Sequence, residues 1–337
     1  MKSAESLSTT SPIVLGPLVL EGVAMLAPMS GVSDLAMRRI ARRFGAALVF
    51  SEMVAAETYL DGGAEAALRA EGEGVVPHAV QLVGREPQAL AETARRVEGA
   101  GAQIIDINMG CPARRVSGAL AGAALMRDLD CAERIIASVV EAVSAPVTLK
   151  MRLGWDETSL NAPELARRAE RAGVKMATVH GRTRRQMYDG RADWKAVGAI
   201  VEAVRIPVLV NGDCATVEDA RAMMAQSGAS GVMVGRAAIG APWLVGAVSQ
   251  ALANGGPLYP PPRRVQAEAA IEHLDWLVAT LGSRAGLRHA RKHLSAYAKV
   301  AGAPGHTLRE LVTTELPDLA RKLLAAAFET RPAKAAA

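Results

Sequence analysis

Residues 104–116 read IIDINMGCPARRV, a strand-like run that ends beside a potentially reactive side chain. The apolar run ends at Asn108-Met109-Gly110, and Cys111 follows it instead of lying inside it. A short apolar run bounded by Gly and Pro is typical of a buried strand. Pro112 restricts Cys111 to an extended backbone, so the thiol is expected at a fixed place beyond the strand. A lowered pKa would make Cys111 a nucleophile and a protonated thiol would make it an acid, and the sequence leaves both roles open.

Similar runs recur along the chain about every 25–30 residues, the length of one βα unit. Segments with helical periodicity lie between them, such as 33–45, 87–101, 129–143 and 217–228. Eight such units predict a closed (β/α)8 TIM barrel of the α/β class in preference to an open sheet. The predicted strands are residues 23–29, 47–54, 78–84, 104–110, 146–154, 176–182, 207–213 and 231–237.

A change of composition follows the eighth unit. Residues 1–250 are assigned to the barrel, and the Gly- and Pro-rich residues 251–264 are predicted to form a linker. Residues 265–330 are helical in pattern and predict a small C-terminal all-α domain, and residues 331–337 are predicted to be a frayed tail.

The overall composition favours a cytoplasmic enzyme. The chain has 337 residues, of which 50% are hydrophobic and only 3% aromatic, which suits a parallel α/β core. Three widely spaced cysteines argue against disulfides and a zinc site, and no metal is expected. Neither a signal peptide nor an apolar stretch long enough to span a membrane is apparent, so no membrane partner is expected.

Polar side chains stand at the predicted strand ends, where barrels of this kind carry their sites. Lys150 lies inside the apolar run VTLKMRL, and a buried ammonium is costly unless an anion or an electron-rich ligand faces it. Asn211-Gly212-Asp213 and Gly235-Arg236 follow strands seven and eight, where barrels commonly bind phosphate. With Gln81 and Asn108 nearby, these ends predict a phosphorylated planar cofactor across the barrel mouth. Cys131 and Cys214 are interpreted as structural.

The helical region carries an acid-free basic run. No Asp or Glu occurs from Ser283 to Arg309, which favours binding to an RNA backbone over a merely solvated face. Few aromatic residues argue for recognition by shape and phosphates instead of base stacking. The predicted RNA contacts in this region are Arg288, Arg291, Lys292 and His293.

Several motifs together resemble the tRNA-dihydrouridine synthases, most closely the bacterial B subfamily. They are LAPMSGVSD (26–34), SEM (51–53), QLVG (81–84), IDINMGCPARRV (105–116), VTLKMRLGW (147–155), HGRTRRQMYDG (180–190), PVLVNGD (207–213), GVMVGRAAIGAPW (231–243) and ARKHLSAY (290–297). Two positions depart from the family pattern: Met37 stands where an aromatic residue is frequent, and Ala296 where tryptophan is common.

The resemblance implies an FMN-dependent barrel that reduces the C5=C6 bond of a D-loop uridine in tRNA, with NADPH or NADH as electron donor. Hydride would pass from the reduced flavin to C6, and Cys111 would deliver a proton to C5. Asn108 would contact the extruded uracil, with Arg182 near the cofactor and substrate. The implied cofactor residues are Pro28, Met29, Ser30, Gln81, Lys150, His180, Asn211, Gly212, Asp213, Gly235 and Arg236.

Two other functions remain as alternatives. An FMN-dependent barrel could reduce a free pyrimidine or enone, and a barrel without catalysis could bind RNA. For the tRNA-modifying function, a functional monomer that does not bind DNA is expected.

Overall fold

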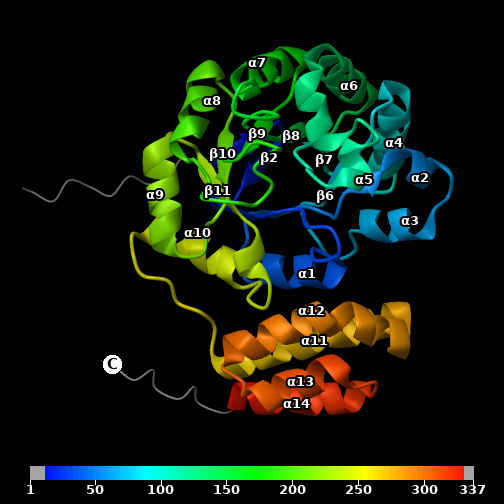
Figure 1. Cartoon of the computed structure of the whole chain (residues 1–337), viewed down its shortest axis with the longest axis vertical. Coiled ribbons are helices and arrows are strands. Elements are labelled where there is room, and N and C mark those ends of the chain that lie inside the picture. Colours follow the sequence, from blue (N-terminus) through cyan, green and yellow to red (C-terminus); the bar gives the residue numbers. More distant parts are fainter. Residues whose placement is uncertain (1–11, 330–337) are drawn as a thin grey trace, which may run out of the picture.

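The computed structural model describes residues 12–329, and within them the predicted barrel is confirmed (Figure 1). Its parallel sheet runs in the order β4-β3-β11-β10-β9-β8-β7-β6-β5. The strands are β3 (Ala24–Leu26), β4 (Leu48–Val49), β5 (Val54–Ala55), β6 (Ala79–Val83), β7 (Ile104–Met109), β8 (Val147–Arg152), β9 (Met176–His180), β10 (Val208–Asn211) and β11 (Gly231–Val234).

The sheet closes because β4 and β5 are two parts of one barrel position. Phe50, just after β4, forms a parallel bridge with Ala79 of β6, and β5 pairs with β6 further along. The predicted strand 47–54 is therefore interrupted. At the interruption the Ser51 hydroxyl, and not a backbone carbonyl, accepts the Gln81 N–H at 2.9 Å.

Helices cover the outside of the barrel (Figure 1). Side-chain caps fix several of their starts: Asp128 accepts from the Cys131 N–H of α6, and Thr216 and Asp219 form a capping box on α9. The helices are α1 (Leu35–Arg43), α2 (Ala56–Leu60), α3 (Ala64–Ala70), α4 (Pro87–Gly99), α5 (Arg114–Ser117), α6 (Leu129–Ala142), α7 (Ala162–Ala172), α8 (Gly198–Ala203), α9 (Val217–Ser227) and α10 (Leu244–Asn254).

A hairpin that the sequence did not predict closes one end of the barrel. It consists of β1 (Ile13–Leu15) and β2 (Leu18–Leu20). Its buried side chains pack in one cluster with Ala79, Ile104 and Met176, the first residues of their strands. The amino end of the barrel is thereby filled with apolar side chains, which leaves the carboxyl end for the site.

The C-terminal region is helical, as predicted, and lies beside α1 (Figure 1). It contains α11 (Arg263–Leu281), α12 (Ser283–Ala301), α13 (Gly305–Thr313) and α14 (Pro317–Glu329). The helical pattern of 308–329 is divided before Pro317, because a proline disfavours helical geometry in the residue that precedes it. The hydrophobic core of the helical region includes Ile40 and Trp243 from the barrel. Residues 255–262, which form neither helix nor strand, connect the barrel to the helical region. No helix among residues 12–329 is long and apolar enough to cross a membrane.

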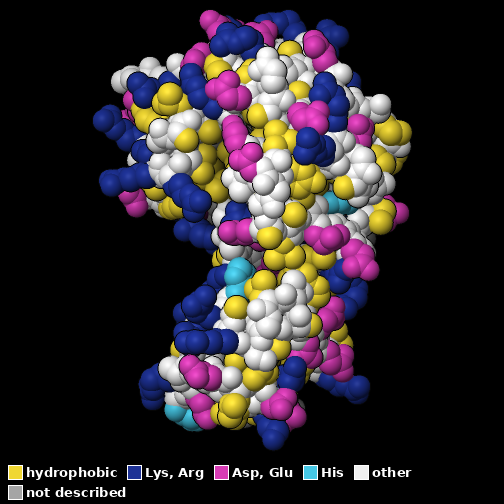
Figure 2. Space-filling model, turned by 90° about the vertical axis from the view of Figure 1, so that its right-hand side faces the viewer, with side chains coloured by type: hydrophobic (Ala, Val, Ile, Leu, Met, Phe, Trp, Pro, Cys, Tyr) yellow, Lys and Arg dark blue, Asp and Glu magenta, His cyan; other side chains and the backbone are white. Residues whose placement is uncertain are grey.

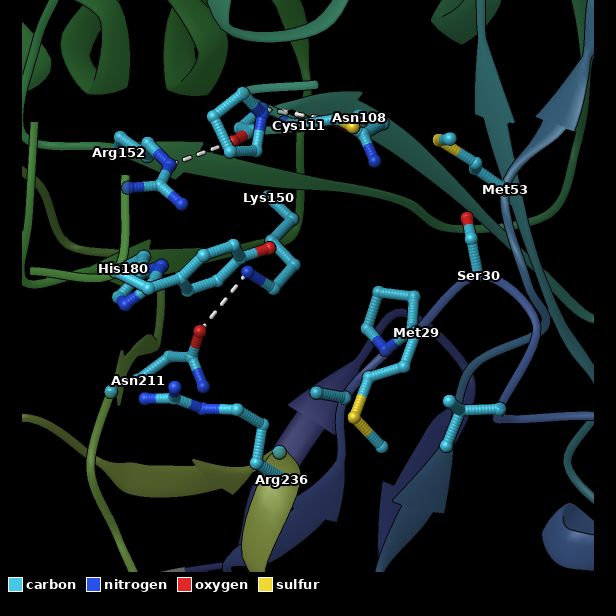
Figure 3. A pocket seen from close by; sticks show the side chains of 18 of the residues that line it. Met29, Ser30, Met53, Asn108, Cys111, Lys150, Arg152, His180, Asn211 and Arg236 are labelled. Carbon is cyan, nitrogen blue, oxygen red and sulfur yellow. Dashed lines mark hydrogen bonds between the residues drawn. The ribbon is translucent and has the colours of Figure 1, made fainter. Parts of the chain in front are cut away.

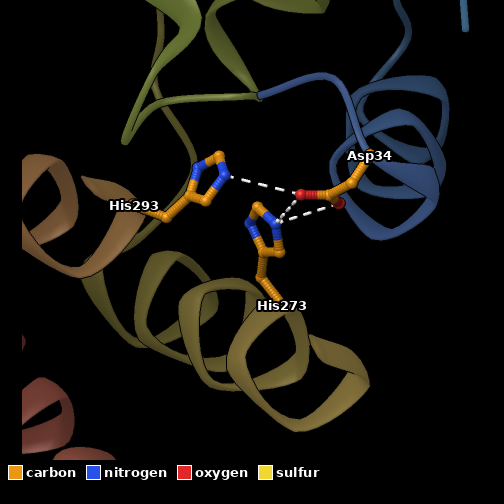
Figure 4. A group of neighbouring side chains, drawn as sticks. All are labelled: Asp34, His273 and His293. Carbon is orange, nitrogen blue, oxygen red and sulfur yellow. Dashed lines mark hydrogen bonds and ion pairs between the residues drawn. The ribbon is translucent and has the colours of Figure 1, made fainter. Parts of the chain in front are cut away.

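Three buried side chains join the barrel to this helical region (Figure 4). Asp34 caps α1 by accepting from the Met37 N–H at 3.0 Å, and its two carboxylate oxygens lie 3.0 and 3.1 Å from His273 Nε2. The Tyr297 hydroxyl lies 3.0 Å from His273 Nδ1, and His293 Nε2 lies 3.4 Å from Asp34. Burial alone would raise the pKa of Asp34, but His273 and His293 outweigh it and hold this pKa well below its usual value.

Candidate active site

A cavity of about 880 Å³ opens at the carboxyl ends of the strands (Figure 3). Its size suits a cofactor-sized ligand. Its lining includes the predicted residues Pro28, Met29, Ser30, Gln81, Asn108, Cys111, Lys150, His180, Asn211, Gly212, Asp213, Gly235 and Arg236. The structure thus brings together strand ends that are up to about two hundred residues apart in the sequence.

The turn after β7 presents Cys111 to this cavity. The Asn108 side-chain oxygen accepts from the backbone N–H groups of Gly110 and Cys111 at 3.1 and 2.9 Å. Burial raises the pKa of Cys111, although the Ala113 N–H and the neighbouring cations Arg152 and Lys150 oppose the shift. The group is therefore a protonated thiol at neutral pH, which suits an acid better than a nucleophile.

A buried carboxylate that was not predicted as a site residue lies below this turn. Asp106 accepts from the Gln81 amide and from the Thr148 hydroxyl, both at 2.6 Å, and Gln81 in turn accepts from the Asn108 amide at 2.7 Å. Burial raises the pKa of Asp106 to about 6, against the lowering effect of Thr148, Gln81 and Lys150. The sequence did contain a signal for this residue, namely a single acid within the apolar run IIDI. A carboxylate buried in such a strand needs hydrogen-bond donors around it, which indicates a polar network.

Lys150 reaches the cavity from β8. Its ammonium lies 3.1 Å from the Asn211 side-chain oxygen, and the Asn211 amide donates to the Met233 carbonyl at 2.8 Å. Burial lowers the pKa of Lys150 to about 8, and Arg152 adds to the shift, while Asp106 and Cys111 oppose it. An acceptor-rich or anionic ligand would stabilise its charged form.

His180 is held neutral among cations. Burial, followed by the charges of Lys150, Arg152, Arg182 and Arg236, lowers the pKa of His180 far below its ordinary value. Arg182 lies 3.3 Å from His180 Nε2, so this nitrogen accepts and Nδ1 carries the hydrogen.

Asp213 organises two arginines. It accepts from the buried Arg182 at 2.6 Å and from Arg236 at 3.2 Å, and also from the Ala192 N–H at 2.8 Å. Arg182 does not line the cavity, whereas the Arg236 side chain is 62% exposed and does. The geometry therefore has Asp213 positioning the arginines, with Arg236 available to a ligand.

The turns after β10 and β11 let the backbone come close to a ligand. Gly212 has φ +120, and a Cβ there would lie 2.7 Å from Ala192 Cβ and 2.9 Å from the His180 ring. A Cβ on Gly235 would meet nothing nearer than 3.9 Å, so this side faces open space. Both turns lie at the edge occupied by Arg236.

Two lining residues, Arg152 and Tyr188, were not among the predicted site residues, although Arg152 stands in the predicted strand 146–154. Arg152 donates to the carbonyls of Gly110, Thr183 and Met187, each at 2.8 Å, and so joins the Cys111 turn to the loop after β9. Tyr188 lies in that loop, and the guanidinium carbons of Arg152 and Arg236 are 5.5 and 5.3 Å from the centre of its ring. The segment QMYDG offered a signal, because an aromatic residue before an Asp-Gly turn is conspicuous in a chain with few aromatics.

The predicted RNA contacts of α12 lie outside the cavity. Arg288 and Lys292 are exposed and Arg291 is half-buried, whereas His293 is 2% exposed and faces Asp34. The Lys292 ammonium lies beside Gly31, because a Cβ placed on Gly31 would be 3.7 Å from Lys292 Nζ. Helix α12 therefore reaches the loop that lines the cavity. Figure 2 shows Lys and Arg side chains on both sides of the narrowing between barrel and helical region.

Comparison with known proteins gives a consistent result. A family model described as dihydrouridine synthase matches residues 25–328. A probable tRNA-dihydrouridine synthase of Rhodobacter capsulatus is 48% identical over 95% of this chain and 99% of its own. A protein of the same description from Rhizobium leguminosarum bv. phaseoli is 49% identical over 81% and 84%. The tRNA-dihydrouridine synthase B of Xanthomonas campestris pv. campestris is 44% identical over 85% and 86%.

Proposed function

Because this chain belongs to the dihydrouridine synthase family, as its motifs predicted, we propose that it reduces the C5=C6 bond of a D-loop uridine in tRNA. FMN is the proposed cofactor, and NADPH or NADH the electron donor. The observation that carries the proposal is one cavity at the barrel mouth that contains the protonated thiol of Cys111, the amide of Asn108 and the ammonium of Lys150.

The residues present fit FMN. Lys150 is a buried cation that needs an electron-rich partner, which the N1–O2 edge of a flavin ring would provide. Pro28, Met29 and Ser30 line one side of the cavity, and Gly212, Gly235 and Arg236 form an edge suited to a phosphate. When bound and reduced, FMN supplies the hydride that adds to C6 of the base.

The chain itself supplies the proton. The S–H bond of Cys111 breaks as the C5–H bond forms, so C6 gains a hydride and C5 a proton, and solvent reprotonates the sulfur. Arg152 holds the Cys111 turn through the Gly110 carbonyl, and Asn108 holds its backbone N–H. Both fix the position of the thiol, which lowers the cost of proton transfer.

The substrate base must leave its stack in tRNA, at a cost of a few kcal/mol. Contacts of Arg288, Arg291 and Lys292 with RNA phosphates would offset that cost. We assign His293 a different part from the one first predicted: its buried ring holds α12 against Asp34, and its neighbour Lys292 is directed to the cavity loop.

Two observations test the proposal. Freshly purified protein should show the absorbance bands of a bound flavin. Dihydrouridine mapped in tRNA should disappear at one or more D-loop positions in cells that lack the gene, and return when the gene is restored. An unchanged map would contradict the proposal, and turnover of free uridine without the helical region would favour the small-molecule alternative.

A further inference from the structure

We propose that a hydrogen-bonded chain, running from Asp106 through Gln81 and Asn108 to the backbone N–H groups of Gly110 and Cys111, makes Asn108 a donor toward the substrate base, and that this selects uracil against cytosine. The inference rests on the proposed function, because it concerns the base that enters the cavity. Asn108 is the specificity-determining residue, and Asp106 and Gln81 are positioning residues.

The chain of contacts is short and buried. Asp106 and Gln81 are 2% and 1% exposed, and Asn108 is 7% exposed. The Gln81 amide nitrogen lies 2.6 Å from Asp106, and the Gln81 oxygen lies 2.7 Å from the Asn108 amide nitrogen. The Asn108 oxygen accepts from the N–H groups of Gly110 and Cys111.

Both ends of this chain have a fixed polarity. Asp106 is ionised above about pH 6 and can then only accept, whereas a backbone N–H can only donate. A side-chain amide could face either way by shape alone, but only one orientation of Gln81 and of Asn108 satisfies both ends. Turning either amide would set oxygen against oxygen or N–H against N–H in a buried site, which is costly.

The fixed orientation determines what Asn108 offers to a ligand. One hydrogen of its NH₂ group goes to Gln81, and the other has no partner among residues 12–329. Asn108 lines the cavity and its amide nitrogen is directed into it (Figure 3). A ligand group at this place must therefore be a hydrogen-bond acceptor.

Uracil and cytosine differ in this respect beside the reacting carbon. C4 is bonded to C5, the proposed proton acceptor of Cys111, and Asn108 holds the backbone of that cysteine. The group on C4 is a carbonyl oxygen in uracil and an amino group in cytosine. The Asn108 N–H would bond to the oxygen but would oppose the amino group, which disfavours cytosine roughly tenfold or more.

Asn108→Asp tests this assignment, because it replaces the donor by an acceptor. Gln81 would then lie between two carboxylates and could donate to only one of them. We expect a lower thermal unfolding temperature, less bound flavin, and a fall of tenfold or more in the ratio of kcat/KM for tRNA with U to that with C at the target position.

The double variant Asp106→Asn/Asn108→Asp provides the sharper test. The new amide at position 106 would donate to Gln81, and Gln81 would donate to the new carboxylate at position 108, so every contact is satisfied in the reverse direction. We expect the unfolding temperature and flavin content to recover relative to Asn108→Asp alone, with the preference shifted toward cytidine. Asp106→Asn alone should retain the preference for uridine, because the backbone N–H groups still orient Asn108.

Asn161→Asp is the control, because Asn161 is a half-buried amide that donates to the Met126 carbonyl at 2.6 Å, outside the chain from Asp106 to Asn108. Combined with Asp106→Asn it should show additive effects on unfolding temperature. The inference is overturned if Asn108→Asp leaves the uridine preference unchanged, or if the double variant is no more stable than additivity predicts. The unfolding measurements require no turnover, so inactivity of the wild-type protein on tRNA would count against the proposed function alone.

Discussion

Cys111 owes its proposed role to its surroundings more than to its own chemistry. The same residue beside a cation at an exposed helix start would be a thiolate, but here burial dominates and its pKa is raised. We predict that Cys111→Ala retains flavin absorbance but forms dihydrouridine about 10²- to 10⁴-fold more slowly, the usual range for loss of a general acid. Cys131→Ala, which changes a buried thiol of α6, should remain active. Equal rates for the two variants would contradict the assignment.

Lys150 gives a prediction on pH. Its pKa of about 8 means that the ammonium loses its proton as pH rises through 8, and the favourable charge toward a bound flavin is lost above that pH. Burial is the main cause of the lowered pKa of Lys150, Arg152 adds to it, and Asp106 and Cys111 oppose it, while His180 nearby is neutral. We expect the Kd for FMN, measured by fluorescence between pH 7 and about 9, to rise by up to about tenfold per pH unit above 8. Lys150→Arg should flatten this dependence, and an equally steep rise in that variant would exclude Lys150 as its source.

Among the elements, α1 connects the cavity loop to the helical region. Asp34 caps α1 and also contacts His273, and it lies two residues after Val32, which lines the cavity. We predict that His273→Ala lowers the free energy of unfolding in urea by about 3–5 kcal/mol, because it leaves a buried carboxylate short of a partner. His306→Ala, at an exposed histidine of α13, should change it by less than about 0.5 kcal/mol. A similar loss in both variants would mean that the Asp34 contact contributes little.

The turn after β10 depends on glycine. In Gly212→Ala the new Cβ would meet Ala192 and His180 at less than 3.0 Å, and φ is +120. We expect lower stability and weaker flavin binding, measured by thermal unfolding and flavin titration. Gly99→Ala, at the last residue of α4 with nothing within 4 Å, should be neutral or slightly stabilising. Normal flavin affinity in Gly212→Ala would contradict the place given to this turn at the phosphate edge.

At the scale of the molecule, the barrel and much of its site could be predicted, because the alternation of strand-like and helix-like runs depends only on residues close together in the sequence. Runs such as VTLKMR are buried on both faces, and the parallel topology brings the carboxyl ends of such strands together. It could therefore be predicted from the sequence alone that Lys150, Asn211 and Arg236 lie around one cavity. Non-local partners could not be predicted. His293 looked like a surface residue because Asp34 is 259 residues away, and β1 and β2 were missed because three-residue strands leave little periodicity.

Helix α12 brings the Lys292 ammonium to Gly31, in the loop whose neighbouring residues Ser30 and Val32 line the cavity. We predict that Arg288→Glu/Lys292→Glu raises KM for tRNA several-fold. The slope of the logarithm of the binding constant against the logarithm of the salt concentration should become shallower by about 0.7–0.9 for each phosphate that is no longer bound. Lys322→Glu on α14, which lies farther from the barrel in Figure 1, is the control and should bind tRNA normally. If charge reversal on α12 and on α14 weakened tRNA binding equally, the effect would come from the overall charge of the protein and not from contacts made by α12.

The most direct test of the central claim is an anaerobic single turnover. The flavin-loaded protein is reduced with one equivalent of NADPH and mixed with unmodified tRNA or with free uridine at the same concentration, while the oxidised-flavin absorbance is followed. We expect tRNA to restore that absorbance with formation of an equal amount of dihydrouridine, and free uridine to leave the flavin reduced. No return of absorbance with tRNA, or an equally fast return with free uridine, would contradict the account.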